Sequence, residues 1–143
     1  MAKVNVSKEL AASQDKVWAV IANPSRFEEW MTLHTKWKEE PPTELGKGSQ
    51  ITEVLTIMGM ANTITWTVDA YDAPNSFTIS GTGMAGAKLN FTLSVEAKGD
   101  SSIATVESEF VSQMMVGAIG GAIERNAAKE LEASLTKLAD LIA

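Results

Sequence analysis

The C-terminal stretch 113–142 carries the longest helical period in the chain and constrains the fold more than any other segment. Its apolar residues recur three or four positions apart, which places them on one stripe of a helix. They are Val116, Ile119, Ile123, Ala127, Leu131, Leu135, Leu138 and Ile142. Such a helix would be about 45 Å long at roughly 1.5 Å per residue, so its stripe needs a large apolar partner surface. Gly117, Gly120 and Gly121 weaken the first turns by about 1 kcal/mol each relative to Ala, so we expect that end to be irregular and to leave space above its partner.

The preceding chain supplies a partner surface through strand-like alternation. A first strand is expected near Val4, Val6 and Leu10, and an edge strand at 34–40. Five further strand-like segments span 49–58, 62–71, 76–82, 87–97 and 102–111. In 87–97 all the odd-numbered positions up to Val95 are apolar. The short turns favour antiparallel neighbours. A sheet with one apolar face needs a cover, and the long helix is the only element large enough to provide it.

Two short helices are expected between the first strand and the edge strand. Ser13 can cap a helix through its hydroxyl, and Asp15 suits the positive first turn. Asn23 and Pro24 end that helix, and Pro24 then fits the first position of a second helix over 25–31.

Composition limits the classes of function. The 143 residues predict one domain, 1–143, and the hydrophobic fraction of 45% and charged fraction of 21% are those of an ordinary globular protein. A net charge of −6 repels nucleic acid. No cysteine is present, which excludes thiolate metal sites and fits a reducing cytoplasm. Residues 1–10 lack the apolar run of a signal peptide, and no apolar run is long enough for a membrane span. We therefore expect a cytoplasmic protein without stable membrane insertion.

The order of these elements, and two local motifs, resemble a known family. Residues 15–21 (DKVWAVI) followed by Trp30 resemble the opening of bacterial polyketide cyclase/dehydrase and lipid-transport proteins, the SRPBCC superfamily. Residues 66–68 with the Tyr-Asp-Ala-Pro sequence at 71–74 resemble that family's fourth strand and turn. The resemblance implies an α+β fold of START-like, or helix-grip, type: a curved antiparallel sheet of six or seven strands around a long C-terminal helix.

A closer resemblance is to an actinobacterial subgroup labelled as the toxin of a type II toxin–antitoxin pair. The residues that carry it are Trp30-Met31-Thr32-Leu33-His34, Trp37, Leu45-Gly46-Lys47-Gly48, Gly59-Met60, Thr65-Trp66-Thr67 and Gly81-Thr82-Gly83. The last of these begins a glycine pattern that also occurs in dinucleotide-binding folds. Because strand alternation and not a helix follows it, we interpret it as a hairpin.

The START-like resemblance implies an apolar cavity between sheet and helix that holds lipids, polyketides or similar ligands. Placed on the predicted elements, its lining would be Trp66, Phe91, Leu93, Val106, Phe110, Met115, Ile119, Ile123 and Ala127. An empty cavity of about 300 Å³ would cost about 7 kcal/mol by the scaling found for engineered cavities. We therefore expect the space to be hydrated, partly collapsed or occupied.

Three polar residues are candidates for chemistry at this cavity. His34 is the only histidine, so a histidine-based metal cluster is excluded; it could act as a general base, although packing or surface exposure is the favoured interpretation. Glu53 shares strand parity with Ile51 and Leu55, so a regular strand would point its carboxylate inward, where desolvation would favour the protonated form. A bulge that turns Glu53 outward is the favoured alternative. Tyr71 is the third candidate for acid–base work.

The leading hypothesis is a binding module for a small hydrophobic or amphipathic ligand, with Glu53 as its polar anchor. The alternatives are a cyclase- or dehydratase-like enzyme that uses His34, Glu53 or Tyr71, and a toxin-like protein that acts through a protein partner. No metal or other cofactor and no nucleic acid partner is expected, and we expect a monomer or weak dimer.

Overall fold

The computed structural model describes residues 2–41, 45–57, 59–83, 88–111 and 117–142. The elements follow the predicted order. They are β1 (Ala2–Leu10), α1 (Gln14–Ile21), the 3₁₀ helix η1 (Pro24–Arg26), α2 (Phe27–Trp30), β2 (His34–Trp37), β3 (Gln50–Ile57), β4 (Met60–Asp72), β5 (Ser76–Thr82), β6 (Lys88–Lys98), β7 (Ser101–Val111) and α3 (Gly117–Ile142).

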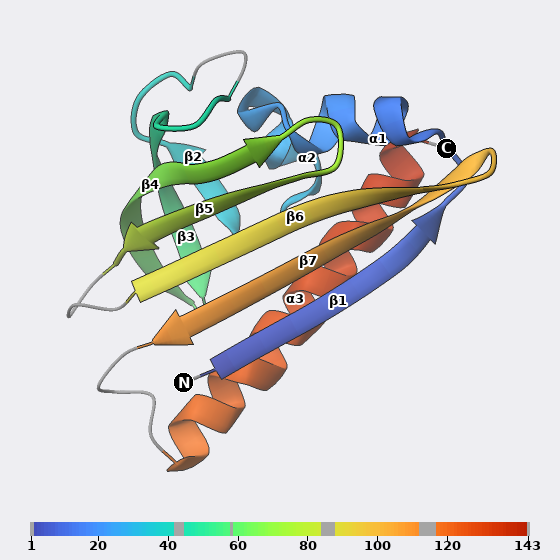
Figure 1. Ribbon diagram of the computed structural model, residues 1–143. Helices are drawn as coiled ribbons and strands as arrows, with labels where there is room; N and C mark the ends of the chain where they lie inside the picture. Colours follow the sequence, from blue (N-terminus) through green and yellow to red (C-terminus); the bar gives the residue numbers. More distant parts are fainter. Residues whose placement is uncertain (1, 42–44, 58, 84–87, 112–116, 143) are drawn as a thin grey trace.

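The strands form one antiparallel seven-stranded sheet in the order β1-β7-β6-β5-β4-β3-β2. The sheet curls, and α3 runs diagonally behind it in the view of Figure 1, while α1 and α2 lie near one end. The predicted α+β helix-grip fold is confirmed. The expected edge strand is also confirmed, although β2 is shorter than the predicted 34–40.

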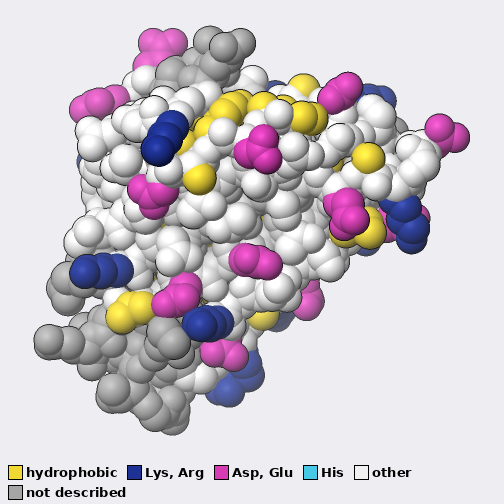
Figure 2. Space-filling model, viewed as in Figure 1, with side chains coloured by type: hydrophobic (Ala, Val, Ile, Leu, Met, Phe, Trp, Pro, Cys, Tyr) yellow, Lys and Arg dark blue, Asp and Glu magenta, His cyan; other side chains and the backbone are white. Residues whose placement is uncertain are grey.

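The inner face of the sheet is the apolar face that the alternation predicts. On β6, the side chains of Leu89, Phe91, Leu93 and Val95 are buried, and the residues between them are exposed or half-buried. The stripe of α3 meets this face with Ala127, Leu131, Leu135, Leu138 and Ile142, all buried. Figure 2 shows the outer face, where acidic and basic side chains are scattered over the surface and hydrophobic ones form a row near the top of the view.

The two short helices begin where their capping residues predict. The Ser13 side chain accepts a hydrogen bond from the Lys16 amide, and the Asn23 side chain accepts one from Ser25. The predicted second helix is divided into η1 and α2, because only one α-helical turn forms before Met31 takes an extended conformation. This early end lets the chain turn into β2.

A cluster of hydroxyl groups joins the end of α2 to the middle of α3. The Thr32 amide donates to Ser134 Oγ at 2.9 Å, and Thr32 Oγ1 donates to the Glu130 carbonyl at 2.9 Å. Ser134 is fully buried and also donates to the Glu130 carbonyl, four residues earlier in the helix. This cluster fixes α3 against the loop that precedes β2.

We expect Ser134→Ala to lower the free energy of unfolding by about 1–3 kcal/mol, because the Thr32 amide loses its acceptor in a partly buried position. Thr136→Ala is the matched control: Thr136 also donates to a carbonyl four residues earlier, but it is exposed. The control should stay within about 0.5 kcal/mol of the wild type. Urea unfolding of both variants measures the difference, and equal losses would contradict the assigned role of the cluster.

Candidate functional site

Glu53 points into the protein interior. The β3–β4 pairing runs without interruption from Gln50 opposite Thr67 to Ile57 opposite Met60, so Glu53 keeps the inward parity of Ile51 and Leu55. Only 3% of its surface is exposed. The favoured prediction of an outward-turning bulge at Glu53 is therefore wrong.

The irregularity lies in the neighbouring strand instead. The register of β2 against β3 shifts between His34 and Lys36. This shift allows His34 and Trp37, three residues apart, to turn toward the interior, while Thr35 and Lys36 are exposed. The bulge in β2 thus places the imidazole next to Glu53.

Two ring nitrogens hold the buried carboxyl group. Trp66 Nε1 donates to Glu53 Oε1 at 2.5 Å, and Glu53 Oε2 is bonded to Nδ1 of His34. The side chain of His34 is 1% exposed and Trp66 is fully buried. A buried carboxylate without hydrogen-bond partners would destabilise the fold by several kcal/mol. These two bonds therefore offset the cost of burying Glu53. We call this group the His34–Glu53–Trp66 cluster.

The imidazole has one nitrogen left for other chemistry. Its ring packs against Trp37, with centroids 4.8 Å apart, and against Phe27 at 6.4 Å. Among the described residues, Nε2 has no hydrogen-bond partner. With Nδ1 facing a carboxylate, Nε2 is an acceptor in the neutral ring and a donor in the protonated ring. It can meet a ligand hydroxyl or carbonyl, or exchange a proton with one.

An aromatic row continues from the cluster across the inner face. The rings of Trp66 and Phe91 lie 5.3 Å apart, and those of Phe91 and Phe110 lie 6.0 Å apart, both edge to face. These three residues stand on β4, β6 and β7. The row therefore links one side of the sheet to the other beneath α3.

Six of the predicted ligand contacts are buried. Trp66, Phe91, Leu93, Val106, Phe110 and Ala127 are all 0–3% exposed. Ile123 is half-buried on α3; Met115 lies outside the described residues, as does the side chain of Ile119. That these residues contact a ligand stays a prediction.

Tyr71 lies apart from the other two polar candidates. Its ring contacts Trp18 of α1 at 5.8 Å and Phe77 at 6.3 Å. It forms no hydrogen bond with His34 or Glu53 in the described part of the chain. The structure thus joins His34 to Glu53 and leaves Tyr71 in a second aromatic group.

Gly81 is a contributor to the site that sequence reasoning assigned only to a hairpin. It pairs with Trp66 across β4 and β5. A Cβ atom at Gly81 would lie 2.6 Å from Ile64 Cγ2, 2.8 Å from the Thr65 carbonyl oxygen and 3.1 Å from Trp66 Cε3. The missing side chain therefore makes room for the indole that donates to Glu53.

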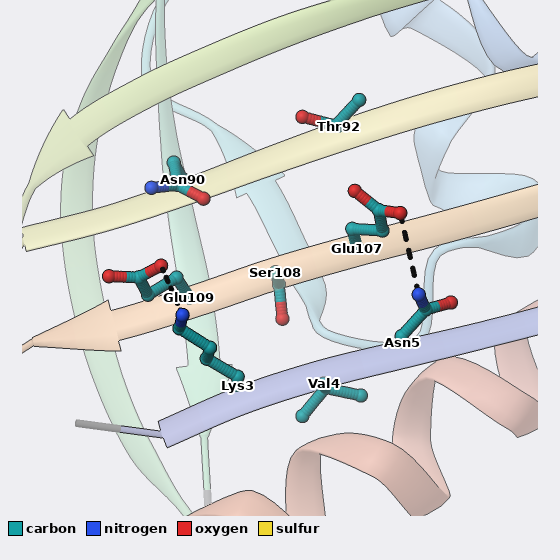
Figure 3. A pocket seen from close by; sticks show the side chains of 8 residues that line it. All are labelled: Lys3, Val4, Asn5, Asn90, Thr92, Glu107, Ser108 and Glu109. Atoms are coloured by element: carbon teal, nitrogen blue, oxygen red, sulfur yellow. Dashed lines mark hydrogen bonds and ion pairs between the residues drawn. The ribbon is translucent and has the colours of Figure 1, made fainter.

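Hollows elsewhere on the described surface are lined mainly by polar residues. One of about 390 Å³ lies on the outer face over β1, β6 and β7, where Lys3 pairs with Glu109 and Asn5 with Glu107 (Figure 3). Another, of about 260 Å³, is lined by Thr32, Thr56, Gly59, Asn126 and Glu130. The described residues contain no group of three or more acidic or histidine side chains that could hold a metal ion.

We expect Gly81→Ala to destabilise the fold by about 1–3 kcal/mol, because the new methyl group overpacks the site against Ile64 and the β4 backbone. It should also change tryptophan fluorescence as the Trp66 indole shifts. Gly83→Ala is the control, since a Cβ there would have no neighbour closer than 3.4 Å. Chemical unfolding followed by fluorescence tests both variants. A Gly81→Ala protein as stable as Gly83→Ala would contradict the close packing.

Comparison with known proteins agrees with this architecture. The uncharacterized protein Rv1546 of Mycobacterium tuberculosis is 33% identical over 141 residues, which cover 99% of each chain. A protein of the same organism named Toxin Rv0910 is 28% identical over 120 residues, 84% of this chain and 83% of that one.

Solved structures show the same fold at low sequence identity. A START superfamily protein from Mycobacterium smegmatis superposes with a TM-score of 0.74 at 16% identity, covering 99% of this chain and 97% of the other. The ZhuI aromatase/cyclase from Streptomyces sp. R1128 gives 0.77 at 17% identity, with 98% and 92% covered.

None of the described helices is both long and apolar enough to cross a membrane. The polyketide cyclase/dehydrase and lipid transport family matches residues 1–143. The chain belongs to that family.

Proposed function

We propose that the protein binds a small hydrophobic or amphipathic molecule, of lipid or polyketide type, between the sheet and α3. The His34–Glu53–Trp66 cluster would be the polar contact and the aromatic row the apolar one. The observation that carries this proposal is a buried His34–Glu53 pair in a mainly apolar interior, in which Nε2 of His34 bonds to none of the described residues.

Stability alone explains such a pair poorly. Well-packed apolar residues in place of a buried ion pair are often neutral or stabilising by about 1–4 kcal/mol, because the charges no longer have to leave water. The Glu53 side chain is only 3% exposed and is bonded to Trp66 and His34, which favours a functional reason for a carboxyl group at this position. Family membership supports a ligand-binding or cyclase-like role.

A ligand would reach the buried cluster from the N-terminal part of α3. There a Cβ atom at Gly121 would approach only Arg125, and Ile123 is half-buried. The C-terminal part is held by buried leucines and by the hydroxyl cluster at Ser134. A ligand that binds only the folded protein should raise its melting temperature.

Acid–base catalysis is the second candidate, and the same cluster supports it. A carboxylate bonded to Nδ1 of a histidine orients the ring and leaves Nε2 to take or give a proton, as in hydrolase triads. His34 and Glu53 have this arrangement. A cyclase- or dehydratase-like enzyme would convert a linear poly-β-ketone analogue into a ring, which mass spectrometry detects, and His34→Asn would abolish that conversion. A toxin-like role with a protein partner is supported only by the relative that bears this name.

The binding proposal is tested with a fatty acid, a lysophospholipid and a hydroxylated aromatic polyketide such as emodin. We expect at least one to raise the melting temperature and to be retained in native mass spectrometry. Glu53→Gln should weaken its binding about tenfold or more, because His34 loses its charged partner.

Glu107→Gln is the matched control, because Glu107 is exposed on the outer face. It should bind like the wild type. If the wild type binds no member of the panel, or if the two glutamine variants lose affinity equally, the proposed site is wrong.

A further inference from the structure

Ser108 carries a buried hydroxyl that the folded chain does not satisfy. It lies on β7 with 4% of its surface exposed, and its Oγ atom has no hydrogen-bond partner among the described residues. Figure 3 shows it between Glu107 and Glu109 on β7. Because side chains alternate along a strand, these two glutamates lie on the outer face and Ser108 does not. Ser102 on the same strand is also buried, but its Oγ atom donates to the Ala12 carbonyl at 2.9 Å. The two serines thus form a natural comparison.

The position of Ser108 relates it to the aromatic row. It pairs with Phe91 on β6 and with Val4 on β1, and the Phe91 ring contacts Trp66 and Phe110. Glu53 stands four strands away, on β3, at the other end of that row. Four strand spacings of about 4.8 Å correspond to roughly 19 Å along the curled sheet. Among the described residues, the unpaired hydroxyl of Ser108 therefore lies at one end of the aromatic row, and Nε2 of His34, on β2 beside Glu53, lies at the other.

The helix crosses the sheet close to Ser108. Glu124 of α3 accepts a hydrogen bond from the Lys3 amide at 3.4 Å. Lys3 directly precedes Val4, the residue of β1 that pairs with Ser108. Glu124 lies next to the half-buried Ile123. A molecule that separates this part of α3 from the sheet would come within reach of the hydroxyl.

We propose that Ser108 is a second polar contact of the ligand site, and that the natural ligand is an elongated amphiphile with two polar groups joined by an apolar part. One group meets Nε2 of His34, the apolar part lies along the aromatic row, and the other group bonds to Ser108 Oγ. A buried hydroxyl without a partner destabilises the folded state, and a ligand that supplies the partner removes this penalty. The inference rests on the proposed function and narrows its ligand class.

The test compares an ω-hydroxy fatty acid with the unsubstituted fatty acid of the same length. The wild type should bind the hydroxy acid about tenfold more tightly, the effect of one buried hydrogen bond. Ser108→Ala should remove this preference while its ligand-free melting temperature stays unchanged or rises. Ser102→Ala should lower the melting temperature, because the Ala12 carbonyl loses its donor, and should keep the preference.

The outcomes separate the two proposals. If the wild type binds both acids equally, or if the preference survives in Ser108→Ala, the proposed ligand contact at Ser108 is wrong. The proposal that a ligand binds at the His34–Glu53–Trp66 cluster is not affected by that result. If the wild type binds neither acid, and no member of the wider panel, the proposed function fails and the second contact fails with it. A lower melting temperature for Ser108→Ala without ligand would also contradict an unsatisfied hydroxyl.

Discussion

The hydrogen bond between the Trp66 indole and the Glu53 carboxylate is the interaction on which the rest of this site depends. It holds a carboxyl group that is only 3% exposed within an apolar face, and it links β3 to β4 through side chains as well as backbone. Gly81 leaves space for the indole, and the bulge in β2 brings His34 to the second carboxylate oxygen. Four strands therefore contribute to one polar cluster. Within the described part of the chain, Nε2 of His34 is the atom of this cluster left for another partner.

The two halves of α3 have different relations to this cluster. The C-terminal half closes the sheet with Leu131, Leu135 and Leu138, and the bonds at Ser134 fix it to the loop before β2. In the N-terminal half, Ile123 is only half-buried, and a Cβ atom at Gly121 would approach only Arg125. We therefore propose this half of α3 as the place where a ligand enters by local opening, without unfolding of the domain.

Much of the architecture follows from the sequence because it depends on local periodicity. Two-residue alternation predicted the buried face of β6, and the stripe from Ala127 to Ile142 predicted the covered face of the sheet. The site was harder to predict, because side chains from distant strands decide it. The alternation of the strand indicated that Glu53 points inward, but it did not indicate which residues bond to its carboxyl group. Trp66 lies thirteen positions away in the sequence and His34 nineteen. The bulge was expected in the wrong strand, since a carboxylate on an apolar face ordinarily turns outward.

Indole N–H signals in an NMR titration with the tightest ligand of the panel test the central claim most directly. The chain has four tryptophans. Trp66 donates to Glu53, whereas Trp18 belongs to the separate group with Tyr71 and Phe77. The account predicts a large shift of the Trp66 signal, together with the His34 ring signals, and an unchanged Trp18 signal. Binding that leaves the Trp66 and His34 signals in place would contradict it.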